Sequence, residues 1–194
     1  MIYISTGGVA DKCGADTAAT LVESGMEAFE LSGGAYSHDQ ESRLRALAVR
    51  CVLQVHNYFP PPAEPFVFNL ASSDAEVARR SMEHVRSAMR LAVKLRNPVY
   101  SFHAGFRIDP SVAELGHPMR THRLRARADA LSDFGERVLV LAREAAREGV
   151  TLLVENNVLT AANMRTYGED PFLLTQPDEM NLFMRSMPAE PSVA

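Results

Sequence analysis

The fold is decided by a short stretch, Cys51-Val-Leu-Gln-Val-His56, in which an apolar run ends in a histidine. The pattern occurs twice more: Val99-Tyr-Ser-Phe-His103 ends in a second histidine, and Val150-Thr-Leu-Leu-Val-Glu155 ends in a glutamate. Short apolar runs rich in β-branched residues predict β-strands, and helical patterns lie between them. Strands that alternate with helices pair in parallel, so their carboxyl ends meet at one edge of the sheet. The sequence therefore predicts that the three polar residues lie together at that edge.

The remaining elements follow the same alternation. Strands are predicted at Ile2–Thr6, Ala28–Leu31, Cys51–His56, Val99–His103 and Val150–Glu155. Helices are predicted at Gly14–Ser24, at His38–Val49, from the capping-box pair Ser73 and Glu76 to Asn97, along the stripe Leu131–Ala145 up to Gly149, and at Asp178–Met187. Residues Pro188–Ala194 are predicted to form an irregular tail.

The connections after the third, fourth and fifth predicted strands are long, whereas those before them are short. Long loops at the carboxyl ends of strands are typical of an α/β barrel, where they form the active site. An open doubly wound sheet also fits, but it more often has a glycine-rich phosphate turn, and neither G-x-G-x-x-G nor G-x-x-x-x-G-K-[ST] occurs. We expect an α/β fold of the (β/α)8 TIM-barrel type, as one domain over residues 1–194 with about five strand–helix units. A full barrel typically needs roughly 250 residues, so this one is expected to be incomplete.

Side chains alternate along a strand, so residues two apart share a face. The faces opposite the three polar strand ends are apolar and hold Cys51, Leu53, Val55, Tyr100, Phe102, Leu152 and Val154. We expect helices to cover these apolar faces, which turns His56, His103 and Glu155 toward the barrel axis. Glu30 follows the same logic in the second strand and is a fourth inward candidate.

The composition bounds the class of protein. The chain has 194 residues, 46% of them hydrophobic, and a net charge of −4, which allows one core and gives no reason to expect a nucleic-acid partner. No apolar stretch approaches the roughly 20 residues that cross a bilayer, and the amino terminus lacks the pattern of a secretory signal. Two cysteines, Cys13 and Cys51, are too few for a disulfide framework. A cytoplasmic location without membrane contact is the simplest expectation.

Four short motifs stand in order along the chain: Val55-His56-Asn57-Tyr58-Phe59, Asn69-Leu70-Ala71-Ser72, Phe102-His103-Ala104-Gly105 and Val154-Glu155-Asn156. With these motifs at its strand ends, the sequence resembles the xylose isomerase-like TIM-barrel superfamily from the first predicted strand to the fifth. That superfamily includes sugar and sugar-phosphate isomerases and epimerases, and also zinc-dependent AP endonucleases.

The resemblance implies that His56, His103 and Glu155 bind a divalent metal, and that Glu155 also transfers protons next to a metal-polarised carbonyl. The expected cofactor is Mn, Co, Mg or Zn, because a mixed set of imidazole and carboxylate ligands does not identify which divalent ion binds. The expected substrate is a sugar or sugar phosphate, with contacts from Glu30, Asn57, Tyr58, Arg107 and Asn156. Relatives complete the site with residues of three further strands, so we expect the 194-residue chain alone to be inactive.

Three functions fit these observations. The leading one is a metal-dependent sugar or sugar-phosphate isomerase or epimerase. The second is a zinc-dependent AP endonuclease-like phosphodiesterase, which would need a basic surface for DNA. The third is a noncatalytic partial barrel that self-associates through exposed strand edges. A purely structural interpretation, in which the three strand-end residues serve separately as hydrogen-bonding groups, also remains open at this stage.

Arginines gather after the fourth predicted strand, at Arg107, Arg120, Arg123, Arg125 and Arg127, with His117 and His122 nearby. An arginine fork suits phosphate, and Arg107 is the best candidate because it lies closest to the strand end. Charged runs usually face water, however, so we expect most of the others to begin a solvated helix. His84 lies mid-helix beside charged residues and is also expected at the surface.

Overall fold

A computed structural model of the chain describes residues 2–8, 12–115 and 123–187. Its elements are β1 (Ile4–Ser5), α1 (Gly14–Glu23), β2 (Ala28–Leu31), α2 (Gln40–Leu47), β3 (Val52–His56), α3 (Ala75–Lys94), β4 (Val99–His103), the 3-10 turn η1 (Val112–Glu114), α4 (Arg127–Glu148), β5 (Thr151–Glu155), α5 (Ala161–Tyr167) and α6 (Pro177–Ser186). The expected tail Pro188–Ala194 lies outside the described residues, as do His117, Arg120 and His122.

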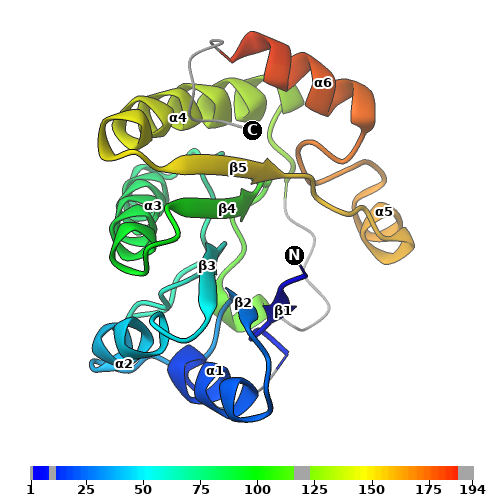
Figure 1. Ribbon diagram of the computed structural model, residues 1–194. Coiled ribbons are helices and arrows are strands. Elements are labelled where there is room, and N and C mark those ends of the chain that lie inside the picture. The colour runs from blue at the N-terminus through cyan, green and yellow to red at the C-terminus, as the bar shows by residue number, and fades with distance from the viewer. Residues whose placement is uncertain (1, 9–11, 116–122, 188–194) are drawn as a thin grey trace.

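All five strands form one parallel sheet in the order β1-β2-β3-β4-β5. Figure 1 shows the sheet curving, with α1 to α4 along its outer side and α5 beyond the carboxyl end of β5. Sequential parallel strands with a helix at each crossover are the building pattern of an α/β barrel. The predicted α/β fold with parallel strands and outer helices is confirmed.

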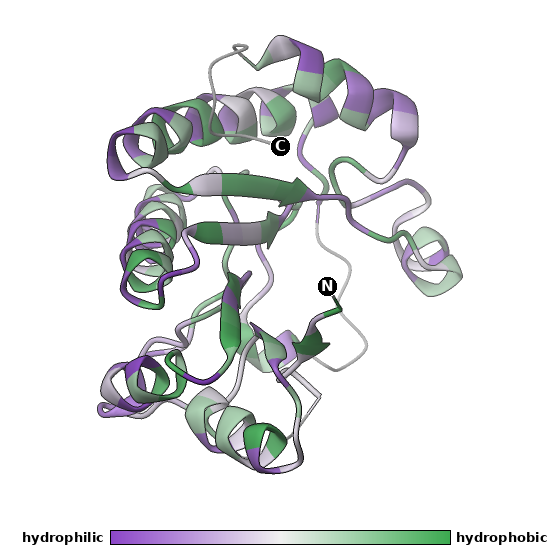
Figure 2. Cartoon of the chain, in the orientation of Figure 1, coloured by the Kyte–Doolittle hydropathy of each residue, from purple (hydrophilic) through white to green (hydrophobic). Residues whose placement is uncertain are grey.

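The hydrophobic core lies between the sheet and the outer helices. Of the seven strand residues predicted to face the helices, Cys51 is partly buried. The other six are buried, at 0–8% exposure: Leu53, Val55, Tyr100, Phe102, Leu152 and Val154. Helix α3 packs on β3 and β4, and α4 packs on β5. The strands are among the most apolar segments in Figure 2, whereas the helices carry both polar and apolar residues. The predicted alternation of faces is therefore confirmed, and the polar strand ends turn away from the helices.

Several element boundaries differ from the prediction for local reasons. Helix α3 is capped by Asp74 rather than Ser73, because the Asp74 carboxylate accepts hydrogen bonds from the backbone N–H groups of Glu76 and Val77. Helix α5 was missed inside the long loop after β5, since it has only seven residues and no buried side chain. Helix α4 ends as predicted at Gly149, which adopts a left-handed φ of 68°.

Two expectations from composition concern cysteines and membranes. Both cysteines are free, with Cys13 buried and Cys51 partly buried. No helix within the described ranges is long and apolar enough to span a bilayer.

Candidate metal centre

The register of the sheet brings the three strand-end residues together. His103 lies directly opposite Glu155 in the β4–β5 pair, and His56 lies opposite Ser101 in the β3–β4 pair. Ser101 and His103 share a face of β4 because they are two residues apart. As a result, ligand atoms of His56, His103 and Glu155 all lie within 4.8 Å of one another.

The contacts within this cluster centre on the Glu155 carboxylate. The Nδ1 atom of His56 lies 2.8 Å from the Ser101 hydroxyl oxygen and 3.3 Å from Oε1 of Glu155. The Nδ1 atom of His103 lies 3.9 Å from Oε2 of the same carboxylate. The two imidazole rings meet edge to face, with centroids 5.2 Å apart. Each histidine therefore approaches a different oxygen of Glu155.

The donor atoms fit a divalent cation. Within the described part of the chain, Nδ1 of His103 is a buried nitrogen without a hydrogen-bond partner, and such atoms are rare because burial without a partner costs free energy. Its 3.9 Å separation from Glu155 is too long for a hydrogen bond. The same separation suits two ligands of one ion, each of which binds at about 2.0–2.2 Å. Two imidazoles and a carboxylate are a donor set for Zn, Mn, Fe or Co.

The local electrostatics keep Glu155 ionised. The hydrogen bond from His56 lowers the pKa of the Glu155 carboxyl, with smaller help from Ser101 and His103, although partial burial opposes the shift. At neutral pH the group is therefore a carboxylate, which is the form that binds a metal or accepts a proton.

A cavity of about 250 Å³ opens beside the cluster. His103 lines it, so the candidate metal centre faces the cavity directly. Aromatic rings of Tyr58, Phe68 and Phe106 contribute to its wall, together with the polar side chains Asn57 and Asn157. Among the described residues, neither lysine nor arginine lines this space. The cavity thus combines apolar ring faces with a few uncharged polar groups.

The predicted substrate residues divide into two groups. Asn57 and Tyr58 line the cavity beside the metal centre. Glu30 is half-buried on β2 opposite Gln54, outside the metal-ligand cluster. Asn156 is exposed and donates a hydrogen bond to the carbonyl of Asn157. The structure therefore brings only the first pair to the cavity.

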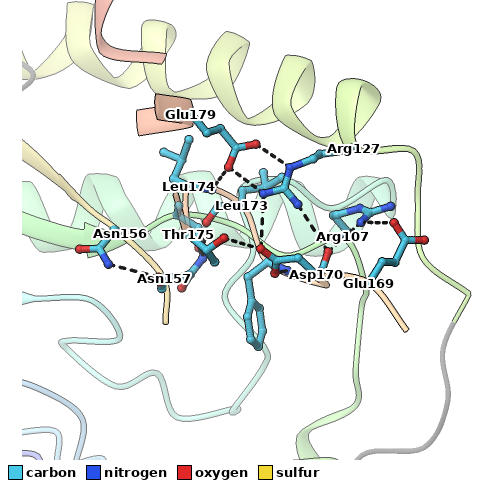
Figure 3. A network of polar contacts seen from close by, with 12 residues as sticks. Arg107, Arg127, Asn156, Asn157, Glu169, Asp170, Leu173, Leu174, Thr175 and Glu179 are labelled. Carbon is cyan, nitrogen blue, oxygen red and sulfur yellow. Dashed lines mark hydrogen bonds and ion pairs between the residues drawn. The ribbon is translucent and has the colours of Figure 1, made fainter. Parts of the chain in front are cut away.

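Arg107 is a correction to the predicted site. Its side chain is 6% exposed and does not line the cavity. It donates to the Arg125 carbonyl, the Asp170 carbonyl and the Glu169 carboxylate, the last at 2.8 Å. Figure 3 shows Arg107 in a polar network that ties the segment after β4 to the segment between α5 and α6. The guanidinium stabilises the fold here and is not available to bind a substrate phosphate, because carboxylate and carbonyl groups already surround it.

Two buried or half-buried amides were missed as functional candidates. Asn69, at 1% exposure, joins the chain before α3 to the loop after β4 through four hydrogen bonds, and its side-chain oxygen accepts a fifth from the nearby Ala71 N–H. Asn157 donates to the carbonyls of Ala104, Gly105 and Leu173. Both residues line the cavity. Their positions in the sequence could have identified them, since Asn69 begins the motif Asn69-Leu70-Ala71-Ser72 and Asn157 directly follows Val154-Glu155-Asn156.

Gly105 has a steric reason for lacking a side chain. A Cβ at this position would lie 2.5 Å from the Ala71 Cβ and 2.9 Å from the Ala71 backbone nitrogen. Contacts that short to backbone force a shift, so only glycine allows the loop after His103 to pack this closely on the Asn69–Ser72 segment. This packing places His103 and Asn69 on adjoining parts of the cavity wall.

His84 is a second correction, because it is buried rather than exposed. Its ring is 6% exposed and packs among Tyr58, Phe66 and Phe68. The charged neighbours in sequence point elsewhere on α3, since a helix turns by about 100° per residue. Burial lowers the pKa of His84 to about 4.

This pKa predicts a pH-dependent stability. His84 stays neutral in the folded protein down to about pH 4 but protonates near pH 6.5 when the chain is unfolded. The contribution of His84 to the free energy of unfolding is therefore complete above pH 6.5 and is lost as the pH falls toward 4. Between pH 7 and pH 5 the free energy of unfolding should fall by about 2 kcal/mol from this group. Urea unfolding at both pH values should show a smaller drop in His84→Gln. Equal drops in both proteins would contradict the assignment.

Comparison with known proteins adds a family and several related folds. A family model described as a xylose isomerase-like TIM barrel matches residues 18–166. No curated protein sequence matches the chain. Among solved structures, a D-tagatose 3-epimerase-like protein is similar with a TM-score of 0.68 and 18% identity, over 96% of this chain and 60% of that one.

Two further structures show the range of the likeness. D-psicose 3-epimerase from Clostridium cellulolyticum H10, solved with D-tagatose, has a TM-score of 0.62 and 18% identity over 94% of this chain and 58% of its own. Endonuclease IV from Thermus thermophilus has a TM-score of 0.53 and 18% identity over 99% of this chain and 60% of its own. The chain spans about three fifths of the length of these structures.

Proposed function

Because the chain belongs to the xylose isomerase-like TIM-barrel family, we propose that the protein is a divalent-metal-dependent isomerase or epimerase of a sugar. The resemblance inferred from the motifs is confirmed, and so is the TIM-barrel type of fold. The observation that carries the functional proposal is the cluster of His56, His103 and Glu155, with ligand atoms within 4.8 Å, beside a cavity with aromatic walls.

The residues of the cluster would share the chemistry as follows. A cation held by His56, His103 and Glu155 would polarise the carbonyl and a neighbouring hydroxyl of the sugar. Glu155 is ionised and serves as the base that removes the proton from the carbon next to that carbonyl. In an isomerisation, Glu155 would return the proton to the former carbonyl carbon, while the hydroxyl proton passes to the former carbonyl oxygen. In an epimerisation, Glu155 would keep the proton, and a second acid on the opposite face of the sugar would donate one to the same carbon. Ser101 keeps the His56 ring in place through its hydroxyl.

The cavity favours a neutral sugar over a sugar phosphate. A phosphate group would need cationic partners, and no described residue that lines the cavity is a lysine or arginine. The rings of Tyr58, Phe68 and Phe106 offer apolar faces to the C–H faces of a sugar, and Asn57 offers an amide for a hydroxyl. A free ketose, the class named for two of the similar structures, is therefore the proposed substrate class.

The phosphodiesterase alternative gains no support from three of the five arginines after β4. Arg107 pairs with Glu169, Arg125 with Asp133, and Arg127 with Glu179. Guanidinium groups that are paired inside the protein are not free to contact a DNA backbone. Abasic DNA nonetheless belongs in the functional test, because the two classes of enzyme share the metal ligands.

Deuterium exchange tests the proposal. The chain would be incubated in D2O with D-tagatose, D-psicose or D-fructose, with Co²⁺, Mn²⁺, Zn²⁺ or EDTA, and NMR would detect deuterium on carbons next to the carbonyl. We expect slow, metal-dependent incorporation into a free ketose and none in EDTA, while net conversion of the sugar by the 194-residue chain alone is expected to stay undetected. The method detects single proton transfers, so slow chemistry suffices. The absence of incorporation with every sugar and metal, or nicking of an abasic oligonucleotide instead, would contradict the proposal.

A further inference from the structure

We propose that His84 and Tyr100 act together as positioning residues for the metal centre. They hold the main-chain carbonyl of Asn57 and thereby fix the turn that directly follows the metal ligand His56. The inference rests on the proposed function in one respect only, that His56 binds the metal. Neither residue belongs to the metal cluster, so the effect passes through Asn57.

The carbonyl oxygen of Asn57 receives two side-chain hydrogen bonds. The Tyr100 hydroxyl donates to it at 2.7 Å, and Nε2 of His84 lies 3.0 Å from it. A carbonyl can only accept, so Nε2 of His84 carries the hydrogen. Tyr100 is fully buried and His84 is 6% exposed. Two buried donors from different elements, β4 and α3, thus converge on one backbone oxygen.

The backbone of Asn57 needs this support. Its φ of 47° lies in the left-handed region, which non-glycine residues adopt at a free-energy cost and which asparagine tolerates better than most. Its N–H donates to the Ser101 carbonyl at 2.6 Å. The backbone N–H of Asn57 is therefore held by β4, and its C=O is held by His84 and Tyr100. Both backbone polar groups of Asn57 are fixed at this turn. The strand end that bears His56 is fixed with them.

His84 also holds the next residue along the chain. Its ring stacks on the Tyr58 ring, with centroids 5.2 Å apart and planes 22° apart. The Tyr58 hydroxyl accepts a hydrogen bond from the Phe66 backbone N–H at 2.8 Å. Because Tyr58 lines the cavity beside His103, His84 supports the cavity wall as well as the turn after His56.

Both side chains are uncharged at neutral pH, and each still carries the hydrogen that it donates to the Asn57 carbonyl. Burial lowers the pKa of His84 to about 4 and raises the pKa of Tyr100 well above its ordinary value. Neither group therefore adds a charge close to the cation site. The pair is a neutral, buried support, in keeping with groups that orient metal ligands rather than bind the metal.

Two substitutions at His84 separate the hydrogen bond from the packing. His84→Phe keeps an aromatic ring against Tyr58 but removes the donor, whereas His84→Gln keeps an amide N–H that can reach the Asn57 carbonyl. Val85→Ala is the matched control, because Val85 is the next residue of α3, is fully buried, and makes no hydrogen bond to Asn57. Co²⁺ serves as the probe, with titration calorimetry for affinity and visible absorption for ligand geometry.

We expect His84→Phe to weaken Co²⁺ binding by about tenfold and to change the Co²⁺ spectrum, in line with losses seen for groups that orient ligands. His84→Gln should restore the wild-type spectrum and most of the affinity. Val85→Ala should lose stability but keep both. Wild-type affinity and spectrum in His84→Phe, or the same change in Val85→Ala, would overturn the proposal.

Hydrogen exchange of the Asn57 amide gives a readout that does not depend on metal. The exchange should be faster in His84→Phe than in Val85→Ala when both are compared with the wild type, since only the first loses support at this turn. Equal exchange in the two variants would overturn the proposal. If the wild-type protein binds no Co²⁺, the proposed function fails, and the exchange rates still decide whether His84 holds the turn.

Discussion

Glu155→Gln is expected to lower the affinity for Co²⁺ or Zn²⁺ by about a hundredfold or more. Substitutions of groups that merely orient ligands cost about 10–100-fold in affinity, and this one removes a proposed direct ligand. Glutamine keeps the shape but loses the negative charge that lies 3.3 Å from His56 and 3.9 Å from His103. Competition with a metal-binding dye would measure the loss. Deuterium exchange into a ketose should also fall below detection, because Glu155 is the proposed base.

Glu23→Gln is the control for this experiment. Glu23 is exposed at the end of α1 and lies outside the cluster, so the substitution removes one negative charge without touching the proposed ligands. Metal affinity within about twofold of the wild type is expected, as surface charges act weakly through water. Equal affinities for wild type and Glu155→Gln, with an intact circular dichroism spectrum, would show that Glu155 is not a ligand.

Asn69→Leu is expected to lower the free energy of unfolding by about 3–5 kcal/mol, because each buried polar group left without a partner costs about 1–3 kcal/mol. The side-chain oxygen Oδ1 of Asn69 accepts hydrogen bonds from the backbone N–H groups of Ala71 and Phe106. Its amide nitrogen donates to the carbonyls of Phe106 and Ile108 and to the Asp109 carboxylate. Leucine has a similar volume but can make none of these bonds. Urea unfolding followed by circular dichroism would measure the change.

Asn156→Leu is the matched control, since it makes the same chemical change at an exposed site. A change below about 0.5 kcal/mol is expected there, as for most surface substitutions. Similar losses at both positions would mean that the effect comes from the exchange of asparagine for leucine and not from the buried hydrogen bonds. The Asn69 variant should also bind ketose more weakly, because Asn69 lines the cavity.

The sequence predicted the order of the five strands and of helices α1 to α4 and α6, and it grouped the three candidate metal ligands. Alternation along each strand is a local property, so the apolar faces of β3, β4 and β5 already indicated which side the helices cover. Parallel strands place their carboxyl ends at one edge, so His56, His103 and Glu155 could be grouped without any knowledge of distances. The same local rules predicted the stop of α4 at Gly149.

The tertiary structure alone decided which polar residues serve the site and which serve the fold. Arg107 follows β4 closely in sequence, yet contacts with Glu169 and Asp170, more than 60 residues away, bury it outside the cavity. His84 has charged neighbours in sequence, but its side of α3 packs against Tyr58. Such contacts join segments far apart along the chain, and local periodicity carries no information about them. Burial and partners are settled only when those segments pack, so the support of Asn57 by His84 and Tyr100 emerged from the three-dimensional arrangement.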